Sequence, residues 1–88
     1  DIGAEAQYYL GSALFNQAKY EEAISAFVRV RTVYVSYDEW FIKSLLKLGE
    51  CYLKIDDKKN AREMYRAVIK RHPDDEYGKE AKNKLEEI

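Results

Sequence analysis

The amino-acid sequence predicts an all-α fold in which two antiparallel helical hairpins are followed by a closing helix. Four glycines and one proline in 88 residues leave little material for turns, which favours long helices over many short strands. Apolar residues recur three and four positions apart through most of the chain, the spacing of one helix face. The chain also repeats itself, because Leu10-Gly11 returns as Leu48-Gly49 after 38 residues.

Composition places residues 1–88 in one small domain. Hydrophobic residues make up 47% and charged residues 35%, the balance of a folded domain. A net charge of −1 supplies no overall field that would attract nucleic acid, and no apolar run approaches the ~18 residues of a membrane span. We therefore expect no nucleic-acid partner and no membrane insertion. The chain begins at Asp1 without methionine, so we expect a fragment or a processed form.

The internal repeat extends well beyond the Leu-Gly pair. At a shift of 38 residues small residues meet small ones and large apolar residues meet large ones, and a partial third copy follows at a shift of 75. The predicted boundaries are about 4–37 for the first repeat, 38–74 for the second and 75–88 for a capping helix. The matched positions are Ala6/Ser44, Leu10/Leu48, Ala13/Cys51, Phe15/Leu53, Ala23/Ala61, Phe27/Tyr65 and Val30/Val68, then Ala6/Ala81 and Leu10/Leu85.

Five helices are predicted from this spacing, at about 4–17, 20–35, 37–55, 58–71 and 75–87. Each carries a row of small or apolar residues that we expect to face the core. These rows are Ala6, Leu10, Ala13 and Leu14; Ala23, Phe27, Val30 and Tyr34; Ser44, Leu48, Cys51 and Tyr52; Ala61, Tyr65, Val68 and Ile69; and Ala81, Leu85 and Ile88.

Signals for helix ends stand at three of the expected boundaries. Ser36–Glu39 has the spacing of a capping box for the third helix. Asp56-Asp57 places negative charge at the start of the fourth helix, where the helix dipole is positive. Pro73 ends the fourth helix, and Asp74-Asp75 supplies a cap for the fifth.

One segment, Phe27–Tyr37, has a competing interpretation. Its sequence FVRVRTVYVSY alternates as a strand does and is rich in β-branched residues, so local propensity favours strand about as much as helix. We predict helix, because the repeat register continues through Phe27 and Val30 and because a lone strand has no partner.

The repeated pattern resembles the tetratricopeptide repeat, whose unit of about 34 residues carries Trp-x-x-Leu-Gly-x-x-Tyr, then Ala-x-x-x-Phe, then Pro. The resemblance covers nearly the whole chain and implies a fragment of a right-handed α-solenoid. The glycine and alanine let the two helices of a hairpin approach closely, and the larger apolar residues fill the space between helices. The first copy supplies Gln7, Leu10, Gly11, Leu14, Ala23 and Phe27, and the second Leu45, Leu48, Gly49, Tyr52, Ala61, Tyr65 and Pro73.

Departures from the family pattern concern the ends of the stack. Gln7 stands where the family has Trp or Leu, as expected of a first helix with no neighbour to cover it. Val35 replaces the closing Pro of the first copy. Glu86 stands where Gly11 and Gly49 stood, so we expect the fifth helix to have no partner helix and to cap the stack.

A second resemblance concerns the tail from His72 to Tyr77, together with Ala81 and Leu85. This tail is similar to bacterial tetratricopeptide proteins of the TolA-binding and outer-membrane-assembly lipoprotein kind, which are periplasmic adaptors. The likeness rests on few residues. It favours the bacterial periplasm over the cytoplasm as the compartment.

A search for chemistry finds no set of catalytic, metal-binding or cofactor-binding residues. We interpret His72 as a solvated helix-end residue and Cys51, which matches Ala13, as a buried structural thiol. One cysteine and one histidine cannot make a four-ligand zinc site, and the scattered glycines form no phosphate loop. The paired aspartates have no EF-hand ligand series. The sequence thus predicts a protein that is not an enzyme and uses no metal or cofactor.

A basic stripe follows one face of the fourth helix, at Lys58, Arg62, Arg66 and Lys70. It is interpreted as a solvated outer face, and the alternative is a footprint for an acidic partner or nucleic acid. The near-neutral net charge favours the solvated face.

The family resemblance implies a concave groove lined by the first helix of each hairpin, and hence a scaffold that binds a peptide or partner protein. Apolar residues edged by polar ones suit such a surface. Lys43 and Lys54 lie about 16 Å apart along one helix face at 1.5 Å per residue, a spacing that could grip two acidic groups of a ligand. Carried over by register, the groove residues are Glu5, Tyr8, Ser12, Phe15 and Asn16 on the first helix and Lys43, Leu46, Glu50, Leu53 and Lys54 on the third.

The alternative function is a structural spacer or oligomerisation segment of a longer α-solenoid, in which neighbouring repeats cover the apolar faces. In that case the groove residues contact each other or neighbouring repeats. A cluster at Tyr34, Tyr37, Trp40 and Phe41 has two interpretations as well, local packing of helix ends or a surface for self-association as a homo-oligomer.

Overall fold

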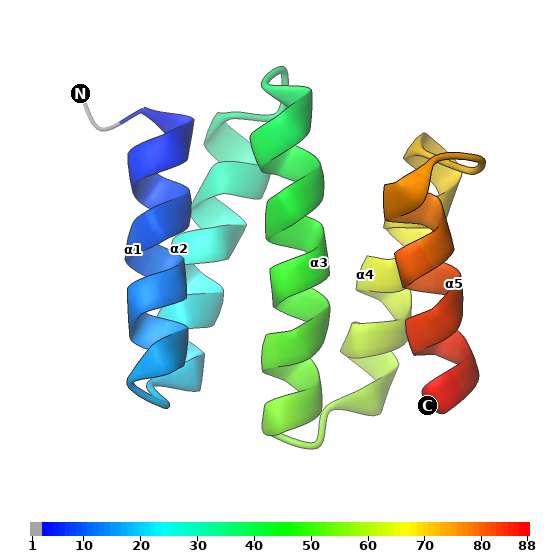
Figure 1. Ribbon diagram of the computed structural model, residues 1–88. Helices are drawn as coiled ribbons and strands as arrows, with labels where there is room; N and C mark the ends of the chain where they lie inside the picture. Colours follow the sequence, from blue (N-terminus) through cyan, green and yellow to red (C-terminus); the bar gives the residue numbers. More distant parts are fainter. Residues whose placement is uncertain (1–2) are drawn as a thin grey trace.

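The computed structural model describes residues 3–88, which form five α-helices (Figure 1). No strand occurs within this range, so the predicted all-α fold is confirmed. The alternating segment 27–37 is helical as far as Val33, because Phe27 and Val30 are buried on one face of that helix. The helices are α1 (Ala4–Asn16), α2 (Tyr20–Val33), α3 (Asp38–Lys54), α4 (Lys58–Arg71) and α5 (Glu76–Glu87).

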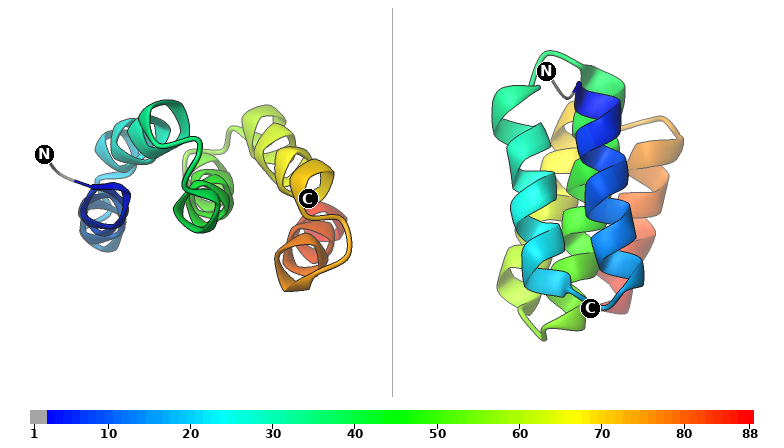
Figure 2. Two further views of the ribbon diagram at one scale, coloured as in Figure 1. Left: turned by 90° about the horizontal axis from the view of Figure 1, so that it is seen from above. Right: turned by 90° about the vertical axis from the view of Figure 1, so that its left-hand side faces the viewer.

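Consecutive helices run antiparallel, and each packs against the next along the chain. Seen from above, α1, α3 and α5 lie on one side and α2 and α4 on the other, with α3 set back between α1 and α5 (Figure 2). The domain measures 35 × 28 × 17 Å along its principal axes. The face made by α1, α3 and α5 is therefore the concave one.

The core gathers around α3, against which α1, α2 and α4 all pack. Its side chains Ile42, Leu45 and Leu48 are almost fully removed from solvent. Phe27 of α2 and Tyr65 of α4 are the largest fully buried side chains. Burial of a side chain of this kind contributes roughly 1.5–3 kcal/mol, so these two rings are major sources of stability.

Each hairpin closes where one of these rings lies against a glycine of the preceding helix. A Cβ atom on Gly11 would come within 2.6 Å of the Phe27 ring, and a Cβ atom on Gly49 would overlap the ring of Tyr65. Only a residue without a side chain fits at either position. The Leu-Gly pairs that identify the repeat in the sequence therefore mark points of close helix approach.

The two hairpins also share the same turn. Ala18 and Asp56, which are 38 residues apart, both adopt the left-handed backbone conformation, with φ of 60° and 61°. In each turn the next amide donates to the carbonyl five residues earlier, at 2.9 Å in the first hairpin and 2.8 Å in the second. Such bonds satisfy carbonyl groups at a helix C-terminus. The two sequence copies are thus structural copies as well.

Two of the predicted helix caps are present and one is wrong. Asp57 and Asp75 each accept a hydrogen bond from the backbone amide three residues later, at 3.2 Å. The capping box Ser36–Glu39 does not form, because Tyr37 is the N-cap of α3 and no side chain caps it. The Glu39 carboxylate pairs with Lys43 one turn further along at 2.9 Å.

The predicted inward face of the first helix is wrong at three of its four positions, and only Leu14 packs against the core. Ala6, Leu10 and Ala13 are exposed. The matching face of α3 is buried because α2 packs on it, whereas no described residue covers this face of α1. The residues that α1 buries are Ala4, Gln7 and Gly11.

The expectation that Gln7 lies uncovered is also wrong. Gln7 is buried by α2, and its Nε2 donates a hydrogen bond to the carbonyl of Ala26 at 3.3 Å. A glutamine at this position is therefore compatible with burial, because the side-chain amide finds a backbone acceptor.

Gly49→Ala is expected to lower the free energy of unfolding by about 1–3 kcal/mol, the usual cost of overpacking. The new methyl group would overlap the ring of Tyr65, and this outweighs the preference of a helix for alanine over glycine of up to ~1 kcal/mol. Urea denaturation followed by circular dichroism measures the loss.

A double-mutant cycle with Tyr65→Leu serves as the control. If the clash is the cause, Gly49→Ala costs less in the Tyr65→Leu background, where the ring is absent. An equal cost in both backgrounds would contradict this explanation.

Candidate functional site

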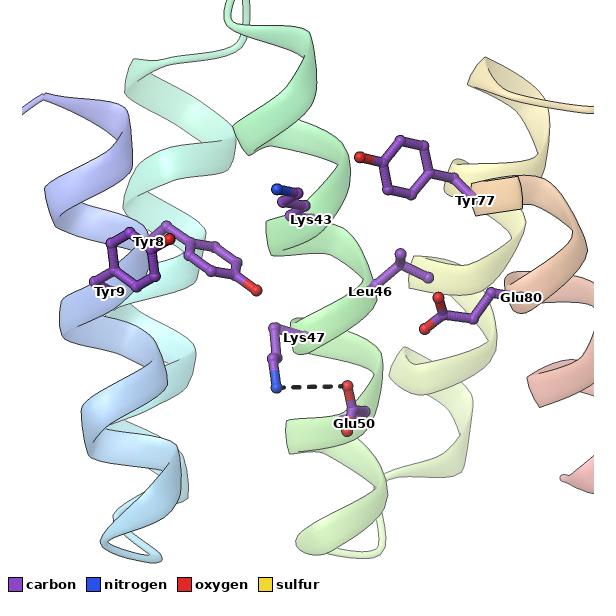
Figure 3. A pocket seen from close by; sticks show the side chains of 8 residues that line it. All are labelled: Tyr8, Tyr9, Lys43, Leu46, Lys47, Glu50, Tyr77 and Glu80. Carbon is purple, nitrogen blue, oxygen red and sulfur yellow. Dashed lines mark ion pairs between the residues drawn. The ribbon is translucent and has the colours of Figure 1, made fainter. Parts of the chain in front are cut away.

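A groove of about 430 Å³ crosses the concave face between α1, α3 and α5 (Figure 3). Its floor is apolar at Leu46, which is buried and belongs to the main core. Its edges carry both tyrosine rings and charged groups. The lining residues are Tyr8, Tyr9, Lys43, Leu46, Lys47, Glu50, Tyr77 and Glu80.

The α1 side of the groove is a wall of aromatic rings. The ring of Tyr8 lies 5.6 Å from Phe27 and 5.5 Å from Trp40, between centroids, so it joins the groove to the core. Tyr9 packs edge-to-face on the outside of this group, with ring centroids 5.5 Å from Tyr8 and 5.9 Å from Trp40. Tyr9 is still 56% exposed, and it is therefore the aromatic surface that the groove offers to solvent.

The lysines of the groove are paired with carboxylates of the same helix, α3. The Lys43 ammonium group donates to Glu39 at 2.9 Å and lies 4.7 Å from the centre of the Trp40 ring. The hydrogen bond to Glu39 raises the pKa of Lys43, so this side chain stays charged. Lys47 is held less firmly, with its Nζ 3.9 Å from the Glu50 carboxylate.

Four of the ten predicted groove residues line this site, namely Tyr8, Lys43, Leu46 and Glu50. The others lie outside its lining: Glu5, Ser12, Phe15 and Asn16 on α1, and Leu53 and Lys54 on α3. Tyr8, Phe15 and Leu53 are partly buried against the core, and Leu46 is fully part of it, so the face is more filled than the sequence predicts.

Two of those six residues, Phe15 and Lys54, have surroundings that the structure describes in detail. The Phe15 ring packs on Tyr20 at 5.4 Å, and Lys47 lies over it at 5.1 Å, so Phe15 is engaged within the chain. Lys54 is exposed at the end of α3, away from the lining that holds Lys43. The structure therefore does not bring the two lysines together in one groove.

Four lining residues were missed by the sequence reasoning: Tyr9, Lys47, Tyr77 and Glu80. Glu80 carried a detectable signal, because at the 75-residue shift it matches Glu5. Tyr77 belongs to the closing helix, which was treated as a cap only. Lys47 lies one turn from Lys43 on the same helix face.

The second aromatic cluster is largely engaged within the chain, and Trp40 packs against the small hydrophobic cluster that contains Tyr34. Tyr34 and Tyr37 pack on each other with centroids 6.0 Å apart. Trp40 joins Tyr8 and Tyr9 on the concave side, whereas the Phe41 ring lies under the Arg71 guanidinium at 4.2 Å. The packing of helix ends is thus present, and a role of these residues in self-association stays a prediction.

His72 is not a solvated helix-end residue, as the sequence suggested. Its Nε2 lies 2.8 Å from Asp38 at the start of α3, and its Nδ1 lies 2.5 Å from Asp75 at the start of α5. Arg71 adds a 2.8 Å ion pair to Asp38 and donates to the carbonyl of Val35 at 3.2 Å. This network ties the ends of three helices together.

The two carboxylates change the titration of the histidine. The hydrogen bond to Asp75, and then that to Asp38, raises the pKa of His72. The same contact lowers the pKa of Asp75. Both ring nitrogens of the imidazole are thereby occupied.

Cys51 is fully buried in α3, in agreement with the prediction of a structural thiol. Burial raises its pKa to about 11, so the thiol stays protonated near neutral pH. A protonated, inaccessible thiol is a poor nucleophile and a poor metal ligand.

Comparison with known proteins agrees with the repeat seen in the fold. The model of the tetratricopeptide repeat matches residues 5–35 and 43–75, one segment in each hairpin. The chain belongs to the tetratricopeptide repeat family. Within residues 3–88 of this tetratricopeptide domain, no helix has the length and apolar character needed to cross a membrane.

A relative of this tetratricopeptide domain is the 131 kDa subunit of transcription factor tau from Saccharomyces cerevisiae, 36% identical over 73 residues. The match covers 82% of the chain but only 7% of the yeast protein. No solved structure gives a significant match. The family match does not distinguish among tetratricopeptide proteins, so the resemblance to TolA-binding lipoproteins stays a prediction.

The His72 network is expected to make stability depend on pH. A raised pKa in the folded state means that the stabilisation is fully present below the pKa of an unfolded histidine, about 6.5, and is lost as pH rises through the folded value. The midpoint of urea denaturation should therefore fall as pH rises from about 6 to 9, and His72→Gln should flatten this profile.

Asp74→Asn is the matched control, since it removes a neighbouring carboxylate that does not pair with His72. It should leave the slope of the pH profile unchanged. A profile that is the same in the original chain and in His72→Gln would show that the network contributes nothing.

Proposed function

We propose that this domain is a protein–protein interaction scaffold without catalytic activity, and that the groove between α1, α3 and α5 binds a peptide or an exposed segment of a partner protein. The observation that carries the proposal is that the exposed ring of Tyr9 and the apolar side chain of Leu46 line the same groove. Tyrosine supplies a large, amphipathic contact area at low cost in side-chain entropy, which is why it is frequent at binding hot spots.

The size of the groove sets the scale of the interaction. A volume of about 430 Å³ holds a few ligand side chains and no large domain surface. With few anchors to offset the ordering of a peptide, we expect a dissociation constant of ~1–100 μM. Affinity of this order suits a reversible contact within a larger assembly.

The charged residues around the groove are expected to contribute more to the selectivity of binding than to its affinity. Lys47 and Glu50 on α3 and Glu80 on α5 present both signs around the groove. Exposed charges of this kind are screened by salt and steer encounter more than they hold a bound ligand. A ligand with complementary charges on either side of an apolar anchor fits this arrangement best.

His72 and Cys51 carry the most reactive kinds of side chain in the domain, and their surroundings favour a binding role over an enzymatic one. His72 has both ring nitrogens on carboxylates, and Cys51 is buried with a raised pKa. The yeast relative is, by its name, a subunit of a transcription factor. By analogy, we propose that this domain also functions as part of a larger protein assembly. The bacterial periplasm as its compartment stays a prediction.

Tyr9→Ala should weaken binding of a groove ligand by at least ~1 kcal/mol, or about fivefold, because it removes the exposed anchor. The ligand is a peptide selected from a displayed random library against the intact chain. Isothermal titration calorimetry with the purified peptide gives the affinity of each variant.

Tyr37→Ala is the matched control, because Tyr37 is 58% exposed against 56% for Tyr9 and also packs on one neighbouring tyrosine, but lies outside the groove. Its affinity should equal that of the original chain. Equal loss in both variants, or loss with Tyr37→Ala alone, places the ligand elsewhere and refutes the groove.

Lys47→Ala should change the association rate constant of the selected peptide more than its dissociation rate constant. Association should become slower for an acidic peptide and faster for a basic one, and the effect should fade between about 50 and 500 mM salt. Stopped-flow fluorescence measures both constants, and Lys54→Ala, outside the groove, is the control. A salt-independent effect on dissociation would contradict this role.

A further inference from the structure

The two signs of charge in the concave groove lie on different sides of it. Both lysines lie on the side of α3 that faces α1 (Figure 3). The Lys43 ammonium group is 4.7 Å from the centre of the Trp40 ring, which packs on the tyrosines of α1. The Lys47 ammonium group is 5.1 Å from the centre of the Phe15 ring on α1. The basic side of the groove is therefore the side next to α1.

Each lysine also has a carboxylate partner on its own helix. Lys43 pairs with Glu39 at 2.9 Å, and Lys47 lies 3.9 Å from Glu50. Glu80, which lines the groove from α5, is exposed and pairs with no basic group among the described residues. The charge that the groove leaves uncompensated is thus negative, and it lies on the side next to α5.

Glu80 belongs to an acidic strip between α3 and α5, which consists of Glu50, Glu80 and Glu87. Glu87 follows Glu80 by seven residues, or about two helical turns, and so lies on the same face of α5. Glu50 lines the groove from α3. Burial, and then these three carboxylates, raise the pKa of the Tyr65 hydroxyl. All three carboxylates are therefore close enough to act on one buried group.

The Tyr65 hydroxyl is an independent observation at the same place. The side chain is fully buried, and its hydroxyl has no hydrogen-bond partner among the described residues. The ring carbon that bears this hydroxyl is the atom nearest to a Cβ built on Gly49, so the hydroxyl lies beside Gly49, the neighbour of Glu50. Buried polar groups without a partner are rare in proteins. The oxygen of this hydroxyl is free to accept a hydrogen bond from a donor that enters between α3 and α5.

The apolar surface beside the strip suits a long side chain. Figure 3 shows the Leu46 side chain pointing from α3 toward α5, where Glu80 stands. Lysine and arginine carry an apolar stem that packs along such a surface and a charged head that reaches past it. A basic side chain of a ligand can thus place its stem on Leu46 and its head at Glu80.

We propose that the segment bound in the groove carries an arginine or a lysine, whose charged head enters between α3 and α5 and pairs with the acidic strip. This inference rests on the proposed function, because it names the ligand chemistry of the same groove. Arginine suits the strip better than lysine, because its planar guanidinium group has five N–H donors and can pair with Glu50 and Glu80 together.

An acidic segment is a poorer occupant of the groove. To bind one, Lys43 would have to leave Glu39 and the Trp40 ring, and Lys47 would have to leave Glu50. An acidic group on the side of α5 would face Glu80 with no counter-charge. A basic group needs no existing pair of Lys43 to break.

The test uses an array of immobilised heptapeptides in which the central residue is arginine, citrulline or glutamate. The other residues are alanine, leucine, serine or tyrosine, so that each peptide has counterparts that differ only at the centre. Citrulline has nearly the shape of arginine without its charge. The fluorescently labelled intact chain should bind the best arginine peptides about threefold to tenfold more tightly than their citrulline counterparts, because only arginine makes a charge-assisted pair.

Glu80→Gln should reduce the preference for arginine over citrulline to less than about twofold and leave the affinity for the citrulline peptides unchanged, because the amide keeps the shape of the carboxylate without its charge. Glu86→Gln is the matched control. Glu86 is also exposed on α5, and its replacement changes the net charge equally, but it lies outside the groove. This variant should keep the full preference for arginine in isothermal titration calorimetry with the purified peptides.

Three outcomes overturn the inference: equal binding of arginine and citrulline peptides, tighter binding of glutamate peptides, and equal effects of Glu80→Gln and Glu86→Gln. Tyr9→Ala then separates this inference from the proposed function. If Tyr9→Ala still weakens peptide binding, the groove binds a ligand of another chemistry and the inference alone fails. If Tyr9→Ala has no effect, or if no peptide of the array binds, both fail.

Discussion

The contact between an aromatic ring and a helix glycine is the constraint on which the rest of this domain depends. Phe27 against Gly11 and Tyr65 against Gly49 set how closely the two helices of each hairpin can lie. This close approach leaves the opposite side of α1 and α3 free to form the concave face. The Tyr8 ring connects the two regions, since it packs on Phe27 and also lines the groove. The position of the groove wall therefore depends on the same ring contacts that hold the hairpin together.

The sequence predicted the fold well, because the repeat register integrates many weak local signals. In α2 it correctly outweighed a strand-like run of β-branched residues, which helix packing tolerates when Phe27 and Val30 are buried. It failed for the face of α1, where Leu10 has the identity of Leu48 but a different environment. Residue type and spacing show that a leucine can be covered, but not whether a covering helix is present. The prediction for His72 failed for a related reason, because its partner Asp38 is 34 residues away in sequence.

The candidate site was predicted in part, and the errors follow from treating groove and core as separate. Leu46 was predicted as a groove residue, yet it is both floor and core. A charged residue at this position would disturb folding and binding together, so it cannot report on binding alone. Tyr77 and Glu80 were absent from the prediction because the closing helix was regarded only as an end to the stack. In the structure α5 is the third wall of the groove.

The left-handed turn at Ala18 has a consequence for how the domain moves. An aspartate, as at position 56, tolerates this conformation more readily than an alanine, for which it costs roughly 1 kcal/mol. The first hairpin therefore carries a strain that its copy largely avoids. Local opening that leaves the rest of the domain folded should begin there, with α1 separating from α2 before α3 and α4 part. The hairpins are alike in geometry, but the first is expected to open more readily than the second.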